Sequence, residues 1–149
     1  MIIRKGRDEI ERIARAGALV AATISHVGER LVPGITLLEL DHAADRFVRS
    51  HGGVPTSQGY KGYPRAICIS ANDVVVHGIP DGSVVEEGDV VTIDVGVTLD
   101  GAIADSAYTF GVGSIDAESQ RLLDTCQDAL AAGIAEARLG KRIGDISHA

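Results

Sequence analysis

The stretch from Val90 to Phe110 constrains the fold most, because it has the pattern of a β-hairpin. Apolar and other residues alternate from Val91 to Leu99, and the pattern resumes at Ala102. The dipeptide Asp100-Gly101 separates the two runs and is a strong short signal for a two-residue hairpin turn. The sequence therefore predicts two long antiparallel strands in which Leu99 faces Ala102.

The same register predicts that two aspartates share one face of the hairpin. It sets Gly96 opposite Asp105 and Asp94 opposite Ala107, and side chains in a strand alternate with a period of two. Diagonal neighbours are about 7–8 Å apart at the backbone, a span that two aspartate side chains can close onto one or two cations. Two carboxylates on one face repel each other unless a cation lies between them. The alternative is an ordinary polar face turned to water.

Length and composition indicate one globular domain. The chain has 149 residues, 45% of them apolar and 23% charged, and we expect a single domain over residues 1–149. No apolar run reaches the ~18 residues of a membrane span, and the N-terminus lacks the pattern of a secretory signal, so we expect a cytoplasmic protein with no membrane partner. A net charge of −7 and only three tyrosines and two phenylalanines argue against a nucleic-acid surface. Cys68 and Cys126 are predicted to be reduced thiols in or near the core.

Helices and strands outside the hairpin follow from periodicity and capping signals. Thr36 and Glu39 form a predicted capping box, and Asp116 is a predicted N-cap. Two strands are predicted around an Asn72-Asp73 turn. The expected elements are helices over about 7–30, 36–51 and 116–140, a loop over 55–64, and strands over 66–70 and 74–77.

A short internal echo follows the first and last of these helices. Gly34–Ala43 and Gly140–Ala149 share the pattern glycine, two residues, apolar, one residue, acid, apolar, one residue, His-Ala. The position of the two segments after equivalent helices indicates a duplicated architecture. The second copy stops as its second helix begins, and no stop signal accompanies Ala149. We therefore expect the chain to be a truncated form of a longer protein.

Several ordered blocks together resemble the type I methionine aminopeptidases. They are Asp8–Ile13, Asn72–Pro80, Gly88–Val95, Asp100-Gly101 and Asp105–Phe110. The resemblance implies an α+β pita-bread fold, of the creatinase/aminopeptidase-like type, with a curved antiparallel sheet and flanking helices. It also implies a dinuclear metal site between two pseudo-symmetric halves, of which this chain carries the N-terminal one.

The resemblance also implies roles for individual residues. Asp94 and Asp105 match metal ligands for two divalent ions, and carboxylate oxygens suit Co, Mn, Fe or Zn. His77 matches a histidine that assists the reaction beside the scissile peptide, whereas the residues alone favour a strand-end histidine without a catalytic role. Three positions match the lining of the pocket for the methionine side chain: Tyr60, Tyr63 and Cys68. Many relatives carry threonine where this chain has Gly96.

The implied activity of the full-length form is removal of the initiator methionine from the N-termini of nascent polypeptides. The remaining ligands lie in the second half of the family's chain, so we expect these 149 residues to be inactive alone and to associate with that half or with themselves. One alternative is an aminopeptidase P or prolidase relative, against which the run His77–Pro80 argues. The other is a non-catalytic pita-bread module that binds peptides or a partner protein.

Overall fold

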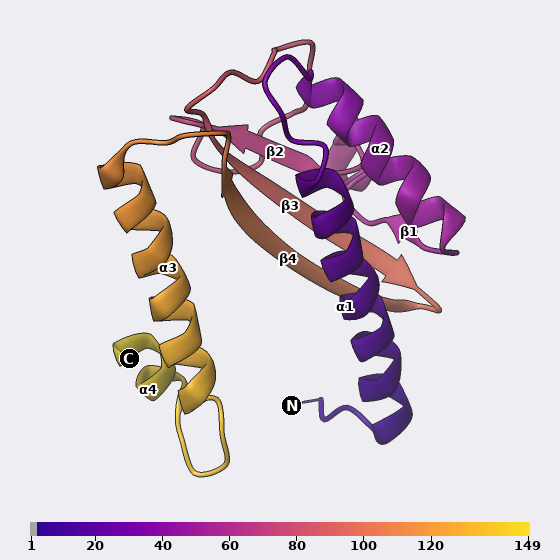
Figure 1. Ribbon diagram of the computed structural model, residues 1–149. Coiled ribbons are helices and arrows are strands. Elements are labelled where there is room, and N and C mark those ends of the chain that lie inside the picture. The colour runs from indigo at the N-terminus through magenta and orange to yellow at the C-terminus, as the bar shows by residue number, and fades with distance from the viewer. Residues whose placement is uncertain (1–2) are drawn as a thin grey trace. The chain divides into compact units, whose positions relative to one another are not determined.

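The computed structural model describes residues 3–149, which fall into two compact units divided between Ser114 and Ile115 (Figure 1). The first unit contains α1 (Arg7–Gly28), α2 (Leu37–Ser50), β1 (Val54–Pro55), the 3-10 turn η1 (Tyr60–Gly62), β2 (Cys68–Ala71), β3 (Val90–Leu99) and β4 (Ala102–Gly111). The second contains α3 (Ala117–Glu136) and α4 (Ile143–His148). Among these residues, no helix is long and apolar enough to cross a membrane.

β3 is the central strand of the sheet. β4 pairs with it antiparallel along its whole length, and β1 and β2 pair with successive parts of its other edge. Gly96 pairs with Asp105, and Asp94 pairs with Ala107, so the predicted hairpin and its register are confirmed. The turn residues Asp100 and Gly101 have φ of 49° and 74°, as a two-residue turn between twisted strands requires.

The two faces of β3 have opposite character. Its alternate valines and isoleucine are fully buried on one face: Val91, Ile93, Val95 and Val97. α1 packs on β3 and β4, and α2 packs on β1 and β2, so the helices supply the apolar stripes that cover this face (Figure 1). The opposite face carries Asp94, which is half-buried, and Asp105, which is exposed. The sheet thus presents its carboxylates away from the apolar core.

The helix signals of the first unit are confirmed. Thr36 is the N-cap of α2, its Oγ1 accepts from the Glu39 N–H at 3.2 Å, and the Glu39 carboxylate accepts from the Thr36 N–H at 2.9 Å. This capping box satisfies two N–H groups that have no partner within the helix. α1 ends at Gly28, two residues before the predicted end.

The expectation of a strand over 74–77 is wrong. Val74, Val75 and Val76 are exposed and belong to no strand. The backbone leaves the sheet because Asn72 (φ 53°) and His77 (φ 56°) both have left-handed conformations, which interrupt an extended path at either end of the segment. The segment therefore forms an exposed loop that returns to β2 only at its far end.

In the second unit, Asp116 caps α3 as predicted, accepting from the N–H groups of Glu118 and Ser119 at 2.8 Å each. The predicted end at Gly140 is wrong, because Ala137 (ψ 64°) already leaves the helical conformation. Cys126 on α3 is exposed, so the expectation that it lies in or near the core is also wrong.

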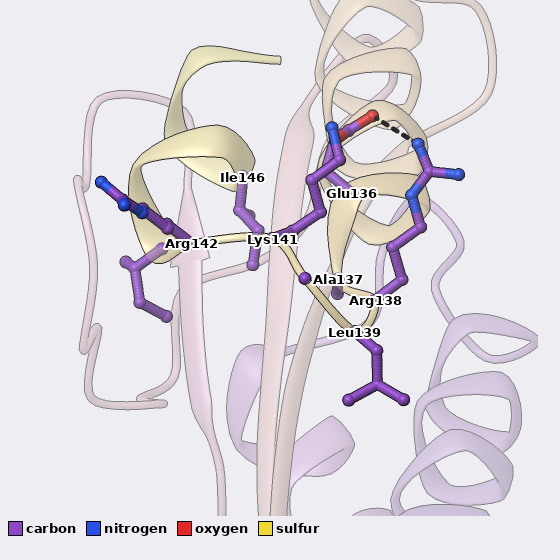
Figure 2. Close-up of a pocket in the computed structure, with 9 residues that line it drawn as sticks. Glu136, Ala137, Arg138, Leu139, Lys141, Arg142 and Ile146 are labelled. Atoms are coloured by element: carbon purple, nitrogen blue, oxygen red, sulfur yellow. Dashed lines mark hydrogen bonds and ion pairs between the residues drawn. The ribbon is translucent and has the colours of Figure 1, made fainter.

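The connection between α3 and α4 is held by ion pairs. The Glu136 carboxylate pairs with Arg138 at 3.4 Å and with Lys141, and these basic side chains project from the residues that follow the helix (Figure 2). The connection surrounds an open hollow of about 520 Å³. These ion pairs span the turn that follows the helix end, which lies four residues before the predicted end at Gly140.

The internal echo has a structural counterpart. In α2 the Glu39 carboxylate accepts from the N-cap N–H, and in α4 the Asp145 carboxylate accepts from the N–H of Arg142 at 2.7 Å. The residues two positions before each N-cap are glycines with left-handed backbones: Gly34 and Gly140. The two helix starts thus share the glycine and the acid that accepts from the N-cap N–H, whereas the side-chain cap of Thr36 has no counterpart at Arg142.

Candidate metal centre

The carboxylates of Asp94 and Asp105 lie on the face of the sheet opposite α1 and α2. A Cβ built on Gly96 would meet Asp105 Oδ2 at 2.9 Å, so the Asp105 carboxylate lies over this glycine. Burial raises the pKa of Asp94, the charge of Asp105 raises it further, and His77 lowers it. The two carboxylates are therefore close enough to repel each other.

These two carboxylates suit a divalent cation. Among the ion pairs of residues 3–149, none joins a lysine or arginine to Asp94 or Asp105. Repulsion between two carboxylates that no lysine or arginine pairs with is the electrostatic situation that a bound dication relieves. Gly96 leaves room between the strands for the ligand oxygens to converge.

His77 reaches the same face from the loop that follows β2. The loop returns at Gly78, whose carbonyl accepts from the Ile69 N–H at 3.1 Å and whose N–H donates to Ser70 Oγ at 3.1 Å. A Cβ on Gly78 would lie 2.1 Å from the Ile69 carbonyl oxygen, so only glycine fits this approach. The contact fixes the position of the exposed His77 beside β2.

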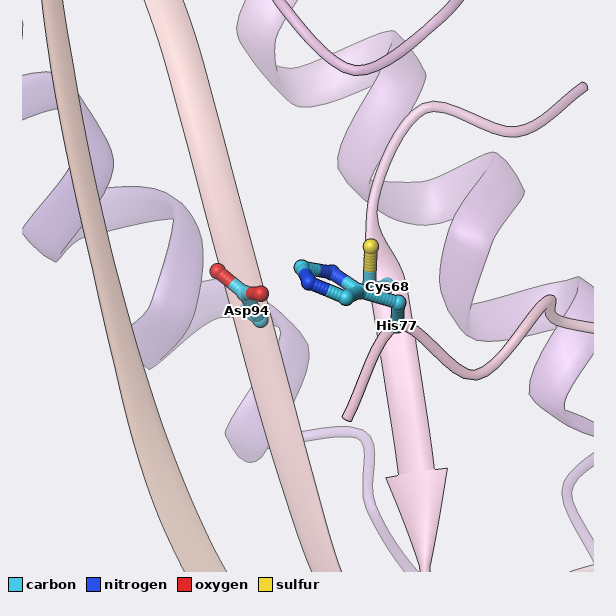
Figure 3. A group of neighbouring side chains, drawn as sticks. All are labelled: Cys68, His77 and Asp94. Carbon is cyan, nitrogen blue, oxygen red and sulfur yellow. The ribbon is translucent and has the colours of Figure 1, made fainter. Parts of the chain in front are cut away.

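Cys68 is the direct neighbour of Asp94 across the β2–β3 pair. Its Sγ, a ring nitrogen of His77 and a carboxylate oxygen of Asp94 all lie within 4.8 Å of one another (Figure 3). Burial raises the pKa of the Cys68 thiol, a hydrogen bond with Tyr63 lowers it, and Asp94 raises it again. The thiol is thus protonated at neutral pH.

An open hollow of about 490 Å³ adjoins His77 and Cys68. Its lining is largely aromatic and apolar and includes Tyr60, Tyr63, Pro64, Cys68, His77 and Ile79. The Tyr63 hydroxyl lies 2.8 Å from the Gly78 carbonyl oxygen and 3.1 Å from that of Ile67, and burial raises its pKa. The structure therefore brings the three predicted pocket residues and His77 together around one hollow.

One buried residue that shapes this region has no role in the sequence-based prediction. Asp41 on α2 is 3% exposed, and its Oδ1 accepts from the N–H groups of Ala66 at 2.8 Å and Ile67 at 3.1 Å. It thereby fixes the two residues that lead into Cys68 and β2. The signal in the sequence is an aspartate next to the apolar stripe of a helix, at Leu37, Leu40, Ala44 and Val48.

Comparison with known families shows to which of them the chain belongs. The model of metallopeptidase family M24 matches residues 11–149 of the chain. The chain belongs to family M24. Methionine aminopeptidase 1 of Bacillus subtilis is 40% identical over 149 residues, which are 100% of this chain and 60% of the relative. Methionine aminopeptidase 1 of Mycobacterium tuberculosis is 41% identical over 150 residues, covering 100% of this chain and 56% of the relative.

Solved structures of M24 relatives agree in fold. A methionine aminopeptidase from Thermotoga maritima has a TM-score of 0.96 at 36% identity, covering 99% of this chain and 60% of that protein. A prolidase from Pyrococcus furiosus has a TM-score of 0.79 at 19% identity, covering 95% and 41%, and shows a shared fold alone. The pita-bread, α+β fold predicted from the sequence is confirmed over the part that the chain covers, which is about 60% of the length of the curated relatives.

Membership of M24 makes the chain part of a metallopeptidase family, whose chemistry depends on divalent metal. Donor atoms lie in two overlapping groups on the sheet face opposite α1 and α2. One group is the Asp94–Asp105 pair, and the other consists of Cys68, His77 and Asp94.

Proposed function

We propose that this M24 chain forms the metal-binding and methionine-binding part of a methionine aminopeptidase. The reaction is hydrolysis of the peptide bond after the initiator methionine at the N-terminus of nascent polypeptides. The observation that carries the proposal is the pair of same-face carboxylates, Asp94 and Asp105, beside an apolar hollow. Relatives named methionine aminopeptidase at about 40% identity support it.

In this proposal Asp94 and Asp105 hold two divalent ions, of Co, Mn, Fe or Zn. Bound ions of this kind polarise a carbonyl group and lower the pKa of a coordinated water. The two aspartates supply the negative charge and the oxygen ligands. Gly96 keeps the space between them free of side-chain atoms, and the β3–β4 ladder fixes their spacing.

His77 is proposed to donate a hydrogen bond to the reacting peptide group. Its ring is exposed and stands between Asp94 and the hollow, so a substrate whose side chain fills the hollow would pass beside it. A positioned donor stabilises negative charge that develops on a carbonyl oxygen in the transition state.

Tyr60, Tyr63 and Cys68 are proposed to form the walls that receive the methionine side chain. This side chain is unbranched and polarisable, and sulfur packs favourably against aromatic rings. The Tyr63 hydroxyl is occupied by the backbone carbonyls of Ile67 and Gly78, so the ring presents its apolar surface to an entering ligand.

The decisive experiment is a chimaeric protein in which residues 1–149 replace the matching part of the Bacillus subtilis relative. We expect the chimaera to release methionine from a Met-Ala-Ser peptide. Asp94→Asn or Asp105→Asn should lower its kcat/KM by at least about 10²-fold, because either change removes a charged ion ligand. Peptide hydrolysis with saturating metal measures the loss.

Asp100→Asn is the matched control, because Asp100 lies in the exposed hairpin turn, where asparagine tolerates the left-handed conformation. Its activity should equal that of the parent chimaera. Full activity in Asp105→Asn would refute the ligand assignment. Cleavage of an Xaa-Pro peptide in preference to Met-Ala-Ser would favour the aminopeptidase P alternative, and a folded chimaera without activity would favour the binding module.

A further inference from the structure

We propose that Cys68, His77 and Asp94 form a site for a single soft or borderline divalent ion, such as Zn²⁺ or Cd²⁺, that overlaps the Asp94–Asp105 pair at Asp94. The three side chains come from β2, from the loop that returns to β2, and from β3 (Figure 3). The proposal concerns the 149-residue chain itself and does not depend on aminopeptidase activity.

The geometry is close to what such an ion requires. One sulfur, one nitrogen and one oxygen atom lie within 4.8 Å of one another. Zn²⁺ bonds of about 2.0–2.3 Å at tetrahedral angles place ligand atoms roughly 3.5 Å apart, so the donors need to close by about 1 Å. Cys68 and Asp94 are fixed opposite each other in the ladder, whereas the ring of His77 is exposed and free to turn toward them.

The donor set determines which ions this site prefers. A thiolate with an imidazole and a carboxylate suits Zn²⁺ or Cd²⁺, whereas the two carboxylates of Asp94 and Asp105 form an all-oxygen pair that also accepts harder ions. On binding, the Cys68 thiol releases its proton to solvent and the sulfur forms the bond to the ion. Three protein ligands leave a fourth tetrahedral position for water.

The site shares Asp94 with the carboxylate pair, so the two sites compete. An ion held by Cys68 and His77 draws Asp94 toward β2 and occupies the imidazole. Soft ions are therefore expected to displace harder ions from Asp94.

Titration of the metal-free 149-residue chain with Cd²⁺ tests the proposal, because thiolate coordination produces a ligand-to-metal charge-transfer band in the ultraviolet. We expect one equivalent of Cd²⁺ to produce the band and an excess of Zn²⁺ to remove it. Cys68→Ser should abolish the band, whereas Cys126→Ser, which changes the exposed cysteine on α3, should leave it unchanged.

Two further variants separate this site from the carboxylate pair. Asp105→Asn should leave the band in place, because Asp105 is not a ligand here, and loss of its nearby negative charge should change the Cd²⁺ affinity far less than loss of a ligand does. His77→Asn, which suits the left-handed backbone at an exposed position, should weaken Cd²⁺ binding at least about tenfold without unfolding the chain.

The proposal is overturned if wild type gives no band, if Cys126→Ser rather than Cys68→Ser removes it, or if Asp105→Asn abolishes it. Failure of the proposed peptidase function would look different: the chimaera would be inactive while the cadmium band and its dependence on Cys68 persisted. Circular dichroism of Cys68→Ser checks the fold, and the exposed His77 supplies an independent variant.

Discussion

Asp41 is a buried carboxylate whose partners are backbone groups rather than a basic side chain. A single oxygen, Oδ1, accepts from the N–H groups of Ala66 and Ile67, both of which are themselves buried. Burial raises the pKa of Asp41, while the two hydrogen bonds and Arg65 lower it. The residue thus acts as an anchor that ties α2 to the start of β2.

We predict opposite outcomes for two substitutions at this anchor. Asp41→Ala leaves two buried N–H groups without an acceptor and should lower the free energy of unfolding by about 2–4 kcal/mol. Asp41→Asn keeps an oxygen at the same place and should change it by less than about 1 kcal/mol. Denaturant unfolding of the two variants measures the difference, and equal losses would contradict the anchoring role.

The raised pKa of Asp41 determines how the unfolding free energies of wild type and Asp41→Asn differ with pH. Between the unfolded pKa of about 3.9 and the higher folded value, the native state binds more protons than the unfolded state. The stabilisation that comes from the protonated form of Asp41 is therefore complete below that window and lost as the pH rises through it, while the hydrogen bonds to Ala66 and Ile67 remain. The unfolding free energy of wild type should fall relative to Asp41→Asn as the pH rises from 4 to 7, and a constant difference would refute this.

At the scale of elements, the β3–β4 hairpin could be predicted because its information is local. Alternation and one Asp-Gly turn set the register, and the register places Asp94 and Asp105 on one face. The segment over 74–77 could not be predicted, because its valines favour a strand while its path depends on the contact of Gly78 with β2. In this segment the contact between Gly78 and Ile69 outweighs the strand propensity of the valines.

Gly78→Ala tests that contact. The added methyl group would meet backbone atoms of Ile69 and Ser70, which cannot turn aside as a side chain can. We expect a loss of about 1–3 kcal/mol in unfolding free energy, and a displaced His77 whose ring resonances shift in the NMR spectrum.

Gly82→Ala is the matched control, because a Cβ there meets nothing within 4 Å. It should leave both the stability and the His77 resonances unchanged. An equally mild effect of Gly78→Ala would mean that the loop does not depend on close approach at this position.

At the scale of the whole molecule, the candidate site could be predicted from the sequence only in part. The proximity of Cys68 to Asp94 arises from the pairing of β2 with β3, which no spacing in the sequence reveals, and its place near a pocket was expected from the family resemblance alone. Asp41 was missed because its hydrogen-bond partners lie 25 and 26 residues away. The roles of the site residues, the single domain and the truncation stay predictions.

We predict that the 149-residue chain alone does not hydrolyse methionyl peptides. A catalytic ion needs about three protein ligands and an open position, and Asp94 and Asp105 cannot supply this for two ions. Incubation of the purified chain with a Met-Ala-Ser peptide and added Mn²⁺ or Co²⁺ should release no methionine, whereas the chimaera should. Hydrolysis that a chelator stops and Asp105→Asn abolishes would prove this wrong.

The two sides of the site differ in how firmly they are held. Asp94 and Cys68 belong to paired strands and cannot shift without breaking the ladder, whereas His77 ends an exposed loop that touches the sheet through a glycine. An entering molecule therefore meets one side that strand pairing holds and one side that the exposed ring of His77 forms, with its backbone tied to β2 at Gly78. Rotation of that ring changes the width of the site while the strand-held side stays in place, so the two sides can change independently.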